Sequence, residues 1–478
     1  MGDQLRVVLL VLVLVFLVNR TIRHIRIARF KKQHGCKAGV RISQSERILG
    51  YGLYKTQVQA SKSRTLLQVG RKRFADNGNT WRATIMGQAF FNTIDPENVK
   101  AILATNFKDF DLGPRQEAFG PLLGQGIFTT DGAQWEHSRA LVRPSFTRAQ
   151  VADLDTFETH IQQFISKIPR DGTTIDLQPL FFQLTLRLRD RVPLRRVRQL
   201  PEQQQRLGAR PLRTPVRLGP EQTGEPESPG MTRETIVSQA LEKSPAHEGE
   251  RYVFLTEMLQ STRDPTQLRD ELLNILLAGR DTTASLLSNT FHVLARQPHI
   301  WKNLKAEVDA LEGVKPDYET LRNMKYLKNL LSECAEIVAL RLCPVVPGHA
   351  RFTNKTTTLP RGGGFDGASP IYIPHGAIVA YSVYNMQRRR DLYGADAEEF
   401  NPDRWDEGLR PGWAYLPFNG GPRICVGQIF ALTEASYTIV RLLQEFAGIE
   451  DRDGSPWEEA LSLTVASAKG VAVAFTPR

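Results

Sequence analysis

Cysteine is scarce in this chain, and its scarcity argues against two classes of protein. Only four cysteines occur in 478 residues, Cys36, Cys334, Cys343 and Cys425, and no two of them have the Cys-x-x-Cys spacing. Paired spacings are typical of disulfide scaffolds and of zinc sites. We therefore expect neither, and isolated cysteines favour a reducing compartment.

Signals for phosphate and nucleic-acid binding are also missing. The glycine run at 362–364 lacks the Gly-Lys-Ser/Thr ending of a phosphate loop, and no helix pattern follows it. The net charge of +11 is mostly local, because residues 187–217 hold ten arginines and two acids. The rest of the chain is nearly balanced, so we expect no nucleic-acid partner.

Long apolar runs are limited to the N-terminus. Residues 7–18 are twelve consecutive Val, Leu or Phe residues, and six basic residues follow between Arg20 and Lys32. Twelve residues are few for a full span, but a basic flank places that side in the cytoplasm. Because no small-x-small cleavage site follows, we predict that residues 1–32 form a membrane anchor, with a cleaved signal peptide as the alternative.

The most informative segment is the run Phe-Asn-Gly-Gly-Pro-Arg-Ile-Cys-Val-Gly at 418–427. Its Cys425 lies just ahead of residues 428–443, whose apolar periodicity predicts a helix. A helix N-terminus favours thiolate over thiol, and a thiolate suits the role of axial metal ligand. The flanking glycines allow close approach to a flat cofactor, and Arg423 could meet an anionic group on it. The alternative is a buried structural cysteine.

This run resembles the haem-binding signature of the cytochrome P450 superfamily, Phe-x-x-Gly-x-Arg-x-Cys-x-Gly. Every fixed position is matched, by Phe418, Gly421, Arg423, Cys425 and Gly427. The resemblance implies a mainly α chain with small β-sheets, the cytochrome P450 fold, with haem between a long central helix and the cysteine loop. It further implies haem b with the Cys425 thiolate as axial ligand, and cofactor contacts from the other four residues.

Two further cofactor contacts follow from a predicted helix that begins at residue 135 and ends near 144. Trp135 and Arg139 are four residues apart and share one helical face. Alone, they would be a partly buried aromatic residue beside a surface arginine. In the family such a Trp-x-x-x-Arg helix faces a haem propionate, so the resemblance assigns this role to both residues. Arg351 is a further propionate candidate.

Residues 268–297 predict a long apolar helix that contains Ala278-Gly279-Arg280-Asp281-Thr282. Glycine inside a helix costs about 1 kcal/mol relative to alanine, so a kinked helix with a satisfied polar cluster is one interpretation. The run also resembles the family's oxygen-activating motif. That resemblance implies that Ala278 and Gly279 leave room over the haem, and that Asp281 and Thr282 support the proton supply.

Shorter elements complete the expected fold. Residues 81–93 and 354–380 predict small sheets, residues 96–104 a helix, and residues 381–393 a short helix.

One departure from the family pattern affects its buried Glu-x-x-Arg network. Arg341 matches the arginine, but Val338 stands where the glutamate belongs, so we infer a five-residue insertion at 335–339 after Glu333. Eight helical residues rise about 12 Å, against about 4.5 Å for three. Without local unwinding, Glu333 and Arg341 cannot both join Arg404 in the network, and an unpaired buried arginine would cost about 3–5 kcal/mol.

A second departure is the segment 187–230, which is rich in Pro, Arg and Gln and has no helical or strand periodicity. In the family the corresponding chain roofs the substrate pocket. We consider a shifted reading frame or a mis-spliced exon, with a disordered arginine-rich loop as the alternative. Sequencing the transcript across this window would decide between them, since an uninterrupted message excludes the frame error.

Within the superfamily, residues 359–367, 381–384 and 425–437 most resemble the fungal membrane-bound enzymes that hydroxylate n-alkanes and fatty acids. The resemblance implies a monooxygenase that inserts one oxygen atom of O₂ into a C–H bond of an apolar substrate. Val345 and Val346 would then lie near the substrate.

Electron supply, location and domain organisation follow from the same resemblance. The chain has no nicotinamide or flavin fingerprint, so electrons would come from NADPH through a separate partner, NADPH-cytochrome P450 reductase. We expect a monooxygenase domain over residues 33–478, at the endoplasmic reticulum membrane and facing the cytoplasm.

Three alternatives stay open. The chain could be a catalytically impaired or haem-free remnant, because both departures affect folding or the pocket. It could act on another lipophilic substrate. A haem-thiolate isomerase or reductase without oxygen activation is disfavoured by Asp281 and Thr282.

Overall fold

The computed structural model describes residues 2–188, 258–259, 261–333, 341–342, 344–406 and 408–478. The chain divides into two compact units, each considered by itself. The sheet unit comprises residues 1–111, 348–386 and 420–422, and the helical unit comprises residues 112–347, 387–419 and 423–478. A monooxygenase domain over residues 33–478 stays a prediction.

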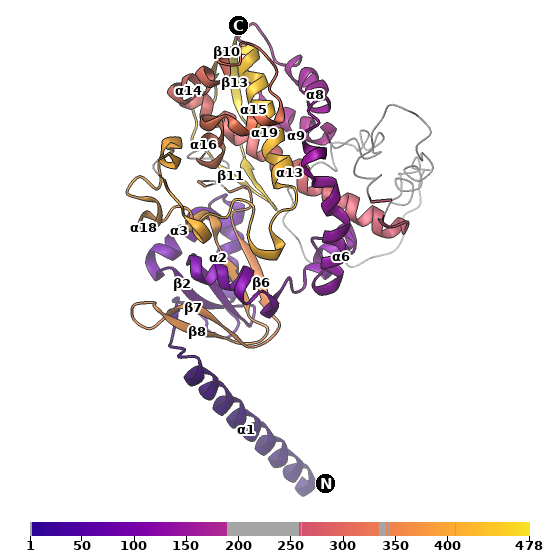
Figure 1. Ribbon diagram of the computed structural model, residues 1–478. Helices are drawn as coiled ribbons and strands as arrows, with labels where there is room; N and C mark the ends of the chain where they lie inside the picture. The colour runs from indigo at the N-terminus through magenta and orange to yellow at the C-terminus, as the bar shows by residue number, and fades with distance from the viewer. Residues whose placement is uncertain (1, 189–257, 260, 334–340, 343, 407) are drawn as a thin grey trace, which may run out of the picture. The chain divides into compact units, whose positions relative to one another are not determined.

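The sheet unit carries a six-stranded sheet, a separate hairpin and several helices (Figure 1). Its helices are α1 (Gly2–Gln33), α2 (Tyr51–Lys62), α3 (Leu66–Asn77), α4 (Pro96–Lys100) and α17 (Val383–Met386), with short turns η1 (Ala101–Thr105) and η2 (Phe107–Asp109). The six strands run in the order β1-β2-β3-β9-β6-β4. They are β1 (Val40–Arg41), β2 (Thr80–Ile85), β3 (Gln88–Thr93), β9 (Ile378–Tyr381), β6 (His349–Thr353) and β4 (Phe110–Asp111). The hairpin is β7 (Thr357–Gly363) with β8 (Ser369–Ile373).

The predicted sheet at 81–93 is confirmed as the antiparallel pair β2–β3. Met86 and Gly87 at its turn have positive φ angles of 48° and 78°, as in the two-residue turns whose twist matches that of the strands. Trp81 and Phe90 share one face, with ring centroids 5.8 Å apart. Packing of large apolar side chains on one buried face therefore helps to fix the register of this pair.

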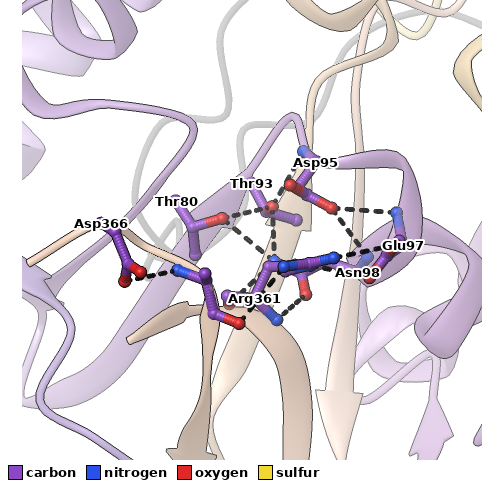
Figure 2. Close-up of polar contacts among 8 residues, drawn as sticks. Thr80, Thr93, Asp95, Glu97, Asn98, Arg361 and Asp366 are labelled. Carbon is purple, nitrogen blue, oxygen red and sulfur yellow. Dashed lines mark hydrogen bonds and ion pairs between the residues drawn. The ribbon is translucent and has the colours of Figure 1, made fainter. Parts of the chain in front are cut away.

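A buried polar cluster joins α4 to the β7–β8 hairpin (Figure 2). The Asn98 amide accepts from the Arg361 backbone N–H at 2.8 Å and donates to the Arg361 carbonyl at 3.1 Å. It also donates to the hydroxyl oxygens of Thr80 and Thr93, at 3.0 and 3.1 Å. On the rim, the Arg361 guanidinium pairs with Glu97. Because these buried polar groups find partners, the cluster holds the hairpin on the sheet without an unmet polar group at Asn98.

The helical unit is built around α13 (Pro265–Arg296) and α19 (Gln428–Glu445). Its other helices are α5 (Arg115–Leu123), α6 (Gly132–Val142), α7 (Arg148–Val151), α8 (Asp155–Ile165), α9 (Leu177–Leu188), α14 (Pro298–Asp309), α15 (Tyr318–Asn323), α16 (Lys325–Glu333) and α18 (Arg390–Tyr393). Single turns are η3 (Arg143–Phe146), η6 (Pro402–Trp405) and η7 (Gly412–Ala414), and η8 (Gly421–Arg423) begins in the sheet unit. Two small sheets hold β10 (Phe446–Asp451), β13 (Ala472–Pro477) and β5 (Ile175–Asp176), and β11 (Glu459–Leu461) with β12 (Val465–Ser467).

The core of the helical unit lies where α9 and α19 pack against α13 (Figure 1). Phe181 of α9 and Phe291 of α13 are fully buried, with ring centroids 5.4 Å apart. The predicted helices at 268–297 and 428–443 are confirmed within a few residues, because both are long and strongly periodic. The prediction of a mainly α chain with small sheets is confirmed as well.

One predicted element differs. Residues 381–393 form two short helices, α17 and α18, rather than one. Between them the side chain of Gln387 donates to the Arg341 carbonyl at 2.7 Å and accepts from the Leu416 N–H at 2.8 Å. The Gln387 carbonyl accepts from the Arg341 guanidinium at 3.0 Å. The Gln387 carbonyl, which a continuous helix would pair internally, thus has a tertiary partner instead.

Candidate functional site

Cys425 lies in the loop between η8 and α19, and its side chain is exposed. Its backbone N–H donates to the carbonyl of Phe418 at 2.9 Å, so the loop folds back on the first residue of the sequence signature. Gly427 is the residue that caps the N-terminus of α19, so the predicted helix start at residue 428 is confirmed. The alternative of a buried structural cysteine is wrong, because the thiol is open to an incoming ligand.

The two signature glycines each lie against another part of their own unit. In the sheet unit Gly421 has a φ of +66°, and a Cβ there would be only 1.9 Å from the Leu103 carbonyl oxygen. In the helical unit a Cβ on Gly427 would be 3.1 Å from the ring of Phe146. The sequence explained both glycines by approach to a cofactor. Packing of the loop against the protein accounts for them directly.

Trp135 on α6 is buried and lies against two arginines that sequence reasoning assigned to the same cofactor. The Arg423 guanidinium lies 4.3 Å from the indole centroid, and that of Arg139 lies 5.9 Å from it. Arg139 donates to the Ile424 carbonyl at 2.8 Å, one residue before the cysteine. The helix and the loop are therefore held together directly at Cys425.

Both arginines at this point lie close to negatively charged groups. Burial lowers the pKa of Arg139, the negative charge of Cys425 opposes that effect, and the neighbouring Arg143 adds to it. Arg423 is paired with Asp131 at 2.6 Å, a residue that the sequence analysis missed. Asp131 also accepts from the Leu112 N–H at 2.9 Å. The only available signal was an acid four residues before the predicted helix start at residue 135, and Asp131 directly precedes the observed α6.

The oxygen-motif residues lie along α13, which continues without a break through Gly279. The Thr282 hydroxyl donates to the Ala278 carbonyl at 2.6 Å. Asp281 Oδ1 is buried 3.5 Å from Arg280 Nη1, in an ion pair without a hydrogen bond. Burial raises the pKa of Asp281, and the Arg280 charge opposes the rise. Asp281 is therefore easier to protonate than an ordinary aspartate.

The predicted substrate residue Val345 is tied to the same helix. Its carbonyl accepts from the Val465 N–H of β12 at 2.9 Å, and the Val465 carbonyl accepts from the Ser285 hydroxyl of α13. Ser285 is three residues beyond Thr282, so Val345 lies close to the oxygen motif. Val345 is buried and Val346 half-buried, which suits apolar contacts. Their role toward a substrate stays a prediction.

Arg341 and Arg404 form a buried network around the segment 396–399. Their partners among the described residues lie outside the inferred insertion. Arg341 is fully buried and donates to the carbonyls of Gln387, Ala397 and Glu399 at 3.0, 2.7 and 3.0 Å. Arg404 pairs with Asp396 at 2.7 Å and also reaches the Glu399 carbonyl. The two arginines thus share one acceptor. The expectation that Arg341 could be left without partners is wrong, because backbone carbonyls satisfy it.

The remaining predicted residues lie outside the described residues, are described only in part, or lie in the sheet unit. The insertion at 335–339 lies outside the described residues, as does the segment 187–230 beyond the end of α9. Of Glu333 only the backbone is described, at the end of α16. Arg351 is buried in β6 of the sheet unit, where it donates to the Ala350 carbonyl at 2.9 Å. Its role stays a prediction.

Taken together, an exposed thiol bordered by two guanidinium groups and an indole suits a flat anionic cofactor bound through its metal. Comparison with known proteins agrees, since the cytochrome P450 family model matches residues 52–196 and 232–469. This chain belongs to the cytochrome P450 family. The gap in the match, 197–231, falls almost wholly within the segment 187–230 that the sequence singled out.

Among similar proteins, cytochrome P450 monooxygenase himC of Aspergillus japonicus is 41% identical over 468 residues, covering 92% of this chain and 83% of that protein. Cytochrome P450 52A13 of Debaryomyces hansenii is 40% identical over 519 residues, covering 98% and 97%. Cytochrome P450 52A3-B of Candida maltosa is 42% identical over 423 residues, covering 79% and 80%. The resemblance and the fold class predicted from the sequence are thereby confirmed.

Membership settles the general chemistry of this P450. It is a haem-thiolate monooxygenase that receives electrons from a reductase partner and takes a hydrophobic substrate. Among the described residues, α1 is long and apolar enough to cross a bilayer, over Gln4–Gln33. The chain is accordingly a membrane-anchored member of the family.

Proposed function

We propose that this P450 hydroxylates n-alkanes or fatty acids at the terminal carbon, with haem b held by the Cys425 thiolate. The observation that carries the ligand assignment is the exposed thiol of Cys425 beside Trp135, Arg139 and Arg423. Haem bound to a cysteine thiolate supplies the oxygen-activating chemistry. The substrate class rests on the sequence resemblance, and the buried Val345 supports an apolar ligand.

The protein's own groups then have distinct tasks. Arg139 and Arg423 offer positive charge to the haem propionates, and Asp131 fixes the direction of Arg423. Asp281 takes up a proton more readily than an ordinary aspartate, because burial raises the pKa of its carboxyl. Thr282 lies on the same helical turn, and its hydroxyl donates a hydrogen bond to the Ala278 carbonyl. Ala278 and Gly279 have small side chains, so this face of α13 leaves room for a flat cofactor. Val345 and Val346 provide apolar surface for the substrate.

Location and electron supply complete the proposal. The basic residues that follow the apolar part of α1 favour a cytoplasmic catalytic domain, and we assign it to the endoplasmic reticulum membrane. NADPH-cytochrome P450 reductase would deliver electrons on the Cys425 side. Arg351 and Phe418 are further cofactor contacts in this proposal, and Gly421 and Gly427 shape the loop.

The deciding experiment is the carbon monoxide difference spectrum of the reduced full-length protein. A Soret band at the red-shifted thiolate position supports Cys425 as ligand, provided that Cys425→Ser loses that band while Cys36→Ser keeps it. Terminal hydroxylation of hexadecane or laurate with added reductase then tests the substrate class. A thiolate band without product from either compound refutes the substrate assignment alone.

The impaired or haem-free remnant is the second candidate, and the insertion at 335–339 is what favours it. The buried network of Arg341 argues against it, because the arginine that the insertion threatened has its partners. A well-folded protein without any haem band would decide for the remnant.

A further inference from the structure

A cavity of about 120 Å³ lies in the sheet unit where α1 ends. Its charged and polarisable lining comes from Lys31, Lys37, Arg82, Cys36 and Tyr372. Among the described residues that line it, none is acidic. One water needs roughly 10–15 Å³ of such space, so the cavity could hold a small charged group with its hydration. No residue assigned above to haem or substrate lines it.

The charges around the cavity suit an anion. Arg82 of β2 is the direct strand partner of Arg41 of β1. Partial burial lowers the pKa of Arg82, and the charge of Arg41 lowers it further. The Lys31 ammonium lies 5.3 Å from the centre of the Tyr372 ring. An anion beside Arg82 would offset its repulsion with Arg41.

Neither the cysteine nor an acid in the lining cancels this positive charge. Burial raises the pKa of the Cys36 thiol, so it is neutral at ordinary pH. Asp366 on the hairpin turn is not among the lining residues, and its carboxylate accepts from the Ala368 N–H of that turn at 3.0 Å (Figure 2). The charged residues that line the cavity are therefore all cationic.

Part of the cavity lining is held in place before any ligand binds. Thr80 and Gly362 line it, and the Thr80 hydroxyl belongs to the buried cluster around Asn98 (Figure 2). Gly362 has a φ of +108°, and a Cβ there would be 2.6 Å from the Thr80 methyl group. A ligand would thus enter a cavity that needs no rearrangement, which lowers the entropic cost of binding.

The surroundings point to a membrane as the source of the anion. The Lys37 N–H donates to the Pro370 carbonyl at 2.9 Å, and the Gly364 N–H donates to the Ala38 carbonyl at 3.0 Å. These bonds hold the β7–β8 hairpin beside the end of the anchor helix (Figure 1). Next to them, Phe365 at the hairpin turn is fully exposed, with a relative accessibility of 111%. A bare aromatic ring beside a membrane anchor is typical of insertion at the lipid interface.

The end of α1 is also suited to the headgroup layer. Arginines recur at 20, 23, 26 and 29, interleaved with isoleucines at 22, 25 and 27. Such a basic stretch next to an apolar run is attracted to an anionic membrane surface. It would keep Lys31 close to lipid headgroups although the apolar run ends at Val18.

We propose that this cavity binds the phosphate-bearing headgroup of an anionic phospholipid while Phe365 inserts into the same leaflet. The site would orient the domain on the membrane at a second point besides α1. It rests on membrane anchoring alone and not on haem or on the hydroxylase proposal, so it can be tested on protein without substrate.

The Cys36 thiol is a built-in reporter of occupancy. Full-length protein is placed in nanodiscs of phosphatidylcholine, with or without about one-fifth phosphatidylserine, and the rate of maleimide addition is read on the Cys36 tryptic peptide. Because a basic residue near a membrane contributes about 1 kcal/mol to binding anionic lipid, we expect phosphatidylserine to slow labelling at least about threefold. The double variant Lys37→Ala/Arg82→Ala should lose this protection. The control Lys72→Ala, exposed on α3 of the same unit, should keep it.

Three outcomes would overturn the proposal. They are equal labelling in both lipids, protection that survives in the double variant, and equal protection by inorganic phosphate or laurate in phosphatidylcholine discs. The last would assign the cavity to a soluble anion or to a substrate carboxylate. A second measurement follows Phe365→Trp, which adds one tryptophan to the native six. Brominated lipid should quench the added emission, and an unquenched signal would show that the membrane does not reach the cavity.

Discussion

Replacing Gly421 by alanine tests the packing of the cysteine loop. The residue has a φ of +66°, and the added Cβ would be 1.9 Å from the Leu103 carbonyl oxygen, well inside the 3.0 Å that real Cβ atoms keep. The left-handed conformation costs an alanine about 1–2 kcal/mol. Forcing apart a packed contact adds about 1–3 kcal/mol. A total of about 2–5 kcal/mol is a large part of the 5–15 kcal/mol that stabilises a typical protein.

Gly454 provides the matched control, because its φ is +62° and no atom lies within 4 Å of a Cβ built there. Gly454→Ala should therefore carry only the conformational cost of about 1–2 kcal/mol. The assay is the fraction of protein that keeps the thiolate carbon monoxide band after a fixed incubation at rising temperature. We expect Gly421→Ala to lose the band at a clearly lower temperature than Gly454→Ala. Equal losses would mean that the approach to Leu103 does not constrain the loop.

Three other predictions follow from the helical unit. Arg341→Met should lower the free energy of unfolding by about 3–5 kcal/mol, because three buried carbonyls lose their donor. Arg341→Lys should lower it by less. Urea unfolding of the two variants measures the difference, and equal midpoints would contradict the prediction. Burial alone would raise the pKa of Glu158, but hydrogen bonds, chiefly from Arg441, lower it to about 2 from 4.5. Since the folded pKa is the lower one, this stabilisation is present above pH 4.5 and is lost as the pH falls toward 2. Glu158→Gln should therefore cost about 2 kcal/mol at neutral pH, after allowance for partial exposure, with the gap closing in acid; a gap independent of pH would refute the pairing. Thr282→Ala should keep the carbon monoxide band yet lower the product formed per NADPH by about tenfold or more, and unchanged coupling would remove Thr282 from the proton supply.

Local pattern accounts for what could be predicted of the fold and the site. The helix with the oxygen motif was predicted at 268–297 and spans Pro265–Arg296, because a long apolar period identifies a helix whatever it packs against. Trp135 and Arg139 were placed on one helical face for the same reason. The signature around Cys425 is local as well, so its loop and the following helix could be inferred from fixed spacing.

The pairings that build the site could not be predicted in this way. Arg423 and Asp131 are separated by 292 residues, and no periodicity relates them. Arg341 was expected to depend on Glu333, yet it takes its partners from carbonyls near residues 387–399. The sequence cannot foresee such partners, because any backbone carbonyl is an equivalent acceptor until the fold brings one within reach.

The sequence by itself determined the family and the helices and gave Cys425 as the proposed thiolate ligand, since these depend on residue type and short-range spacing. Only the tertiary structure decided that Gly421 is required by Leu103, that Arg423 is held by Asp131, and that a cationic cavity forms between the end of α1 and the β7–β8 hairpin. Each of these depends on atoms that meet across long stretches of chain. Packing and electrostatics act on distance in space, which short-range sequence spacing does not encode.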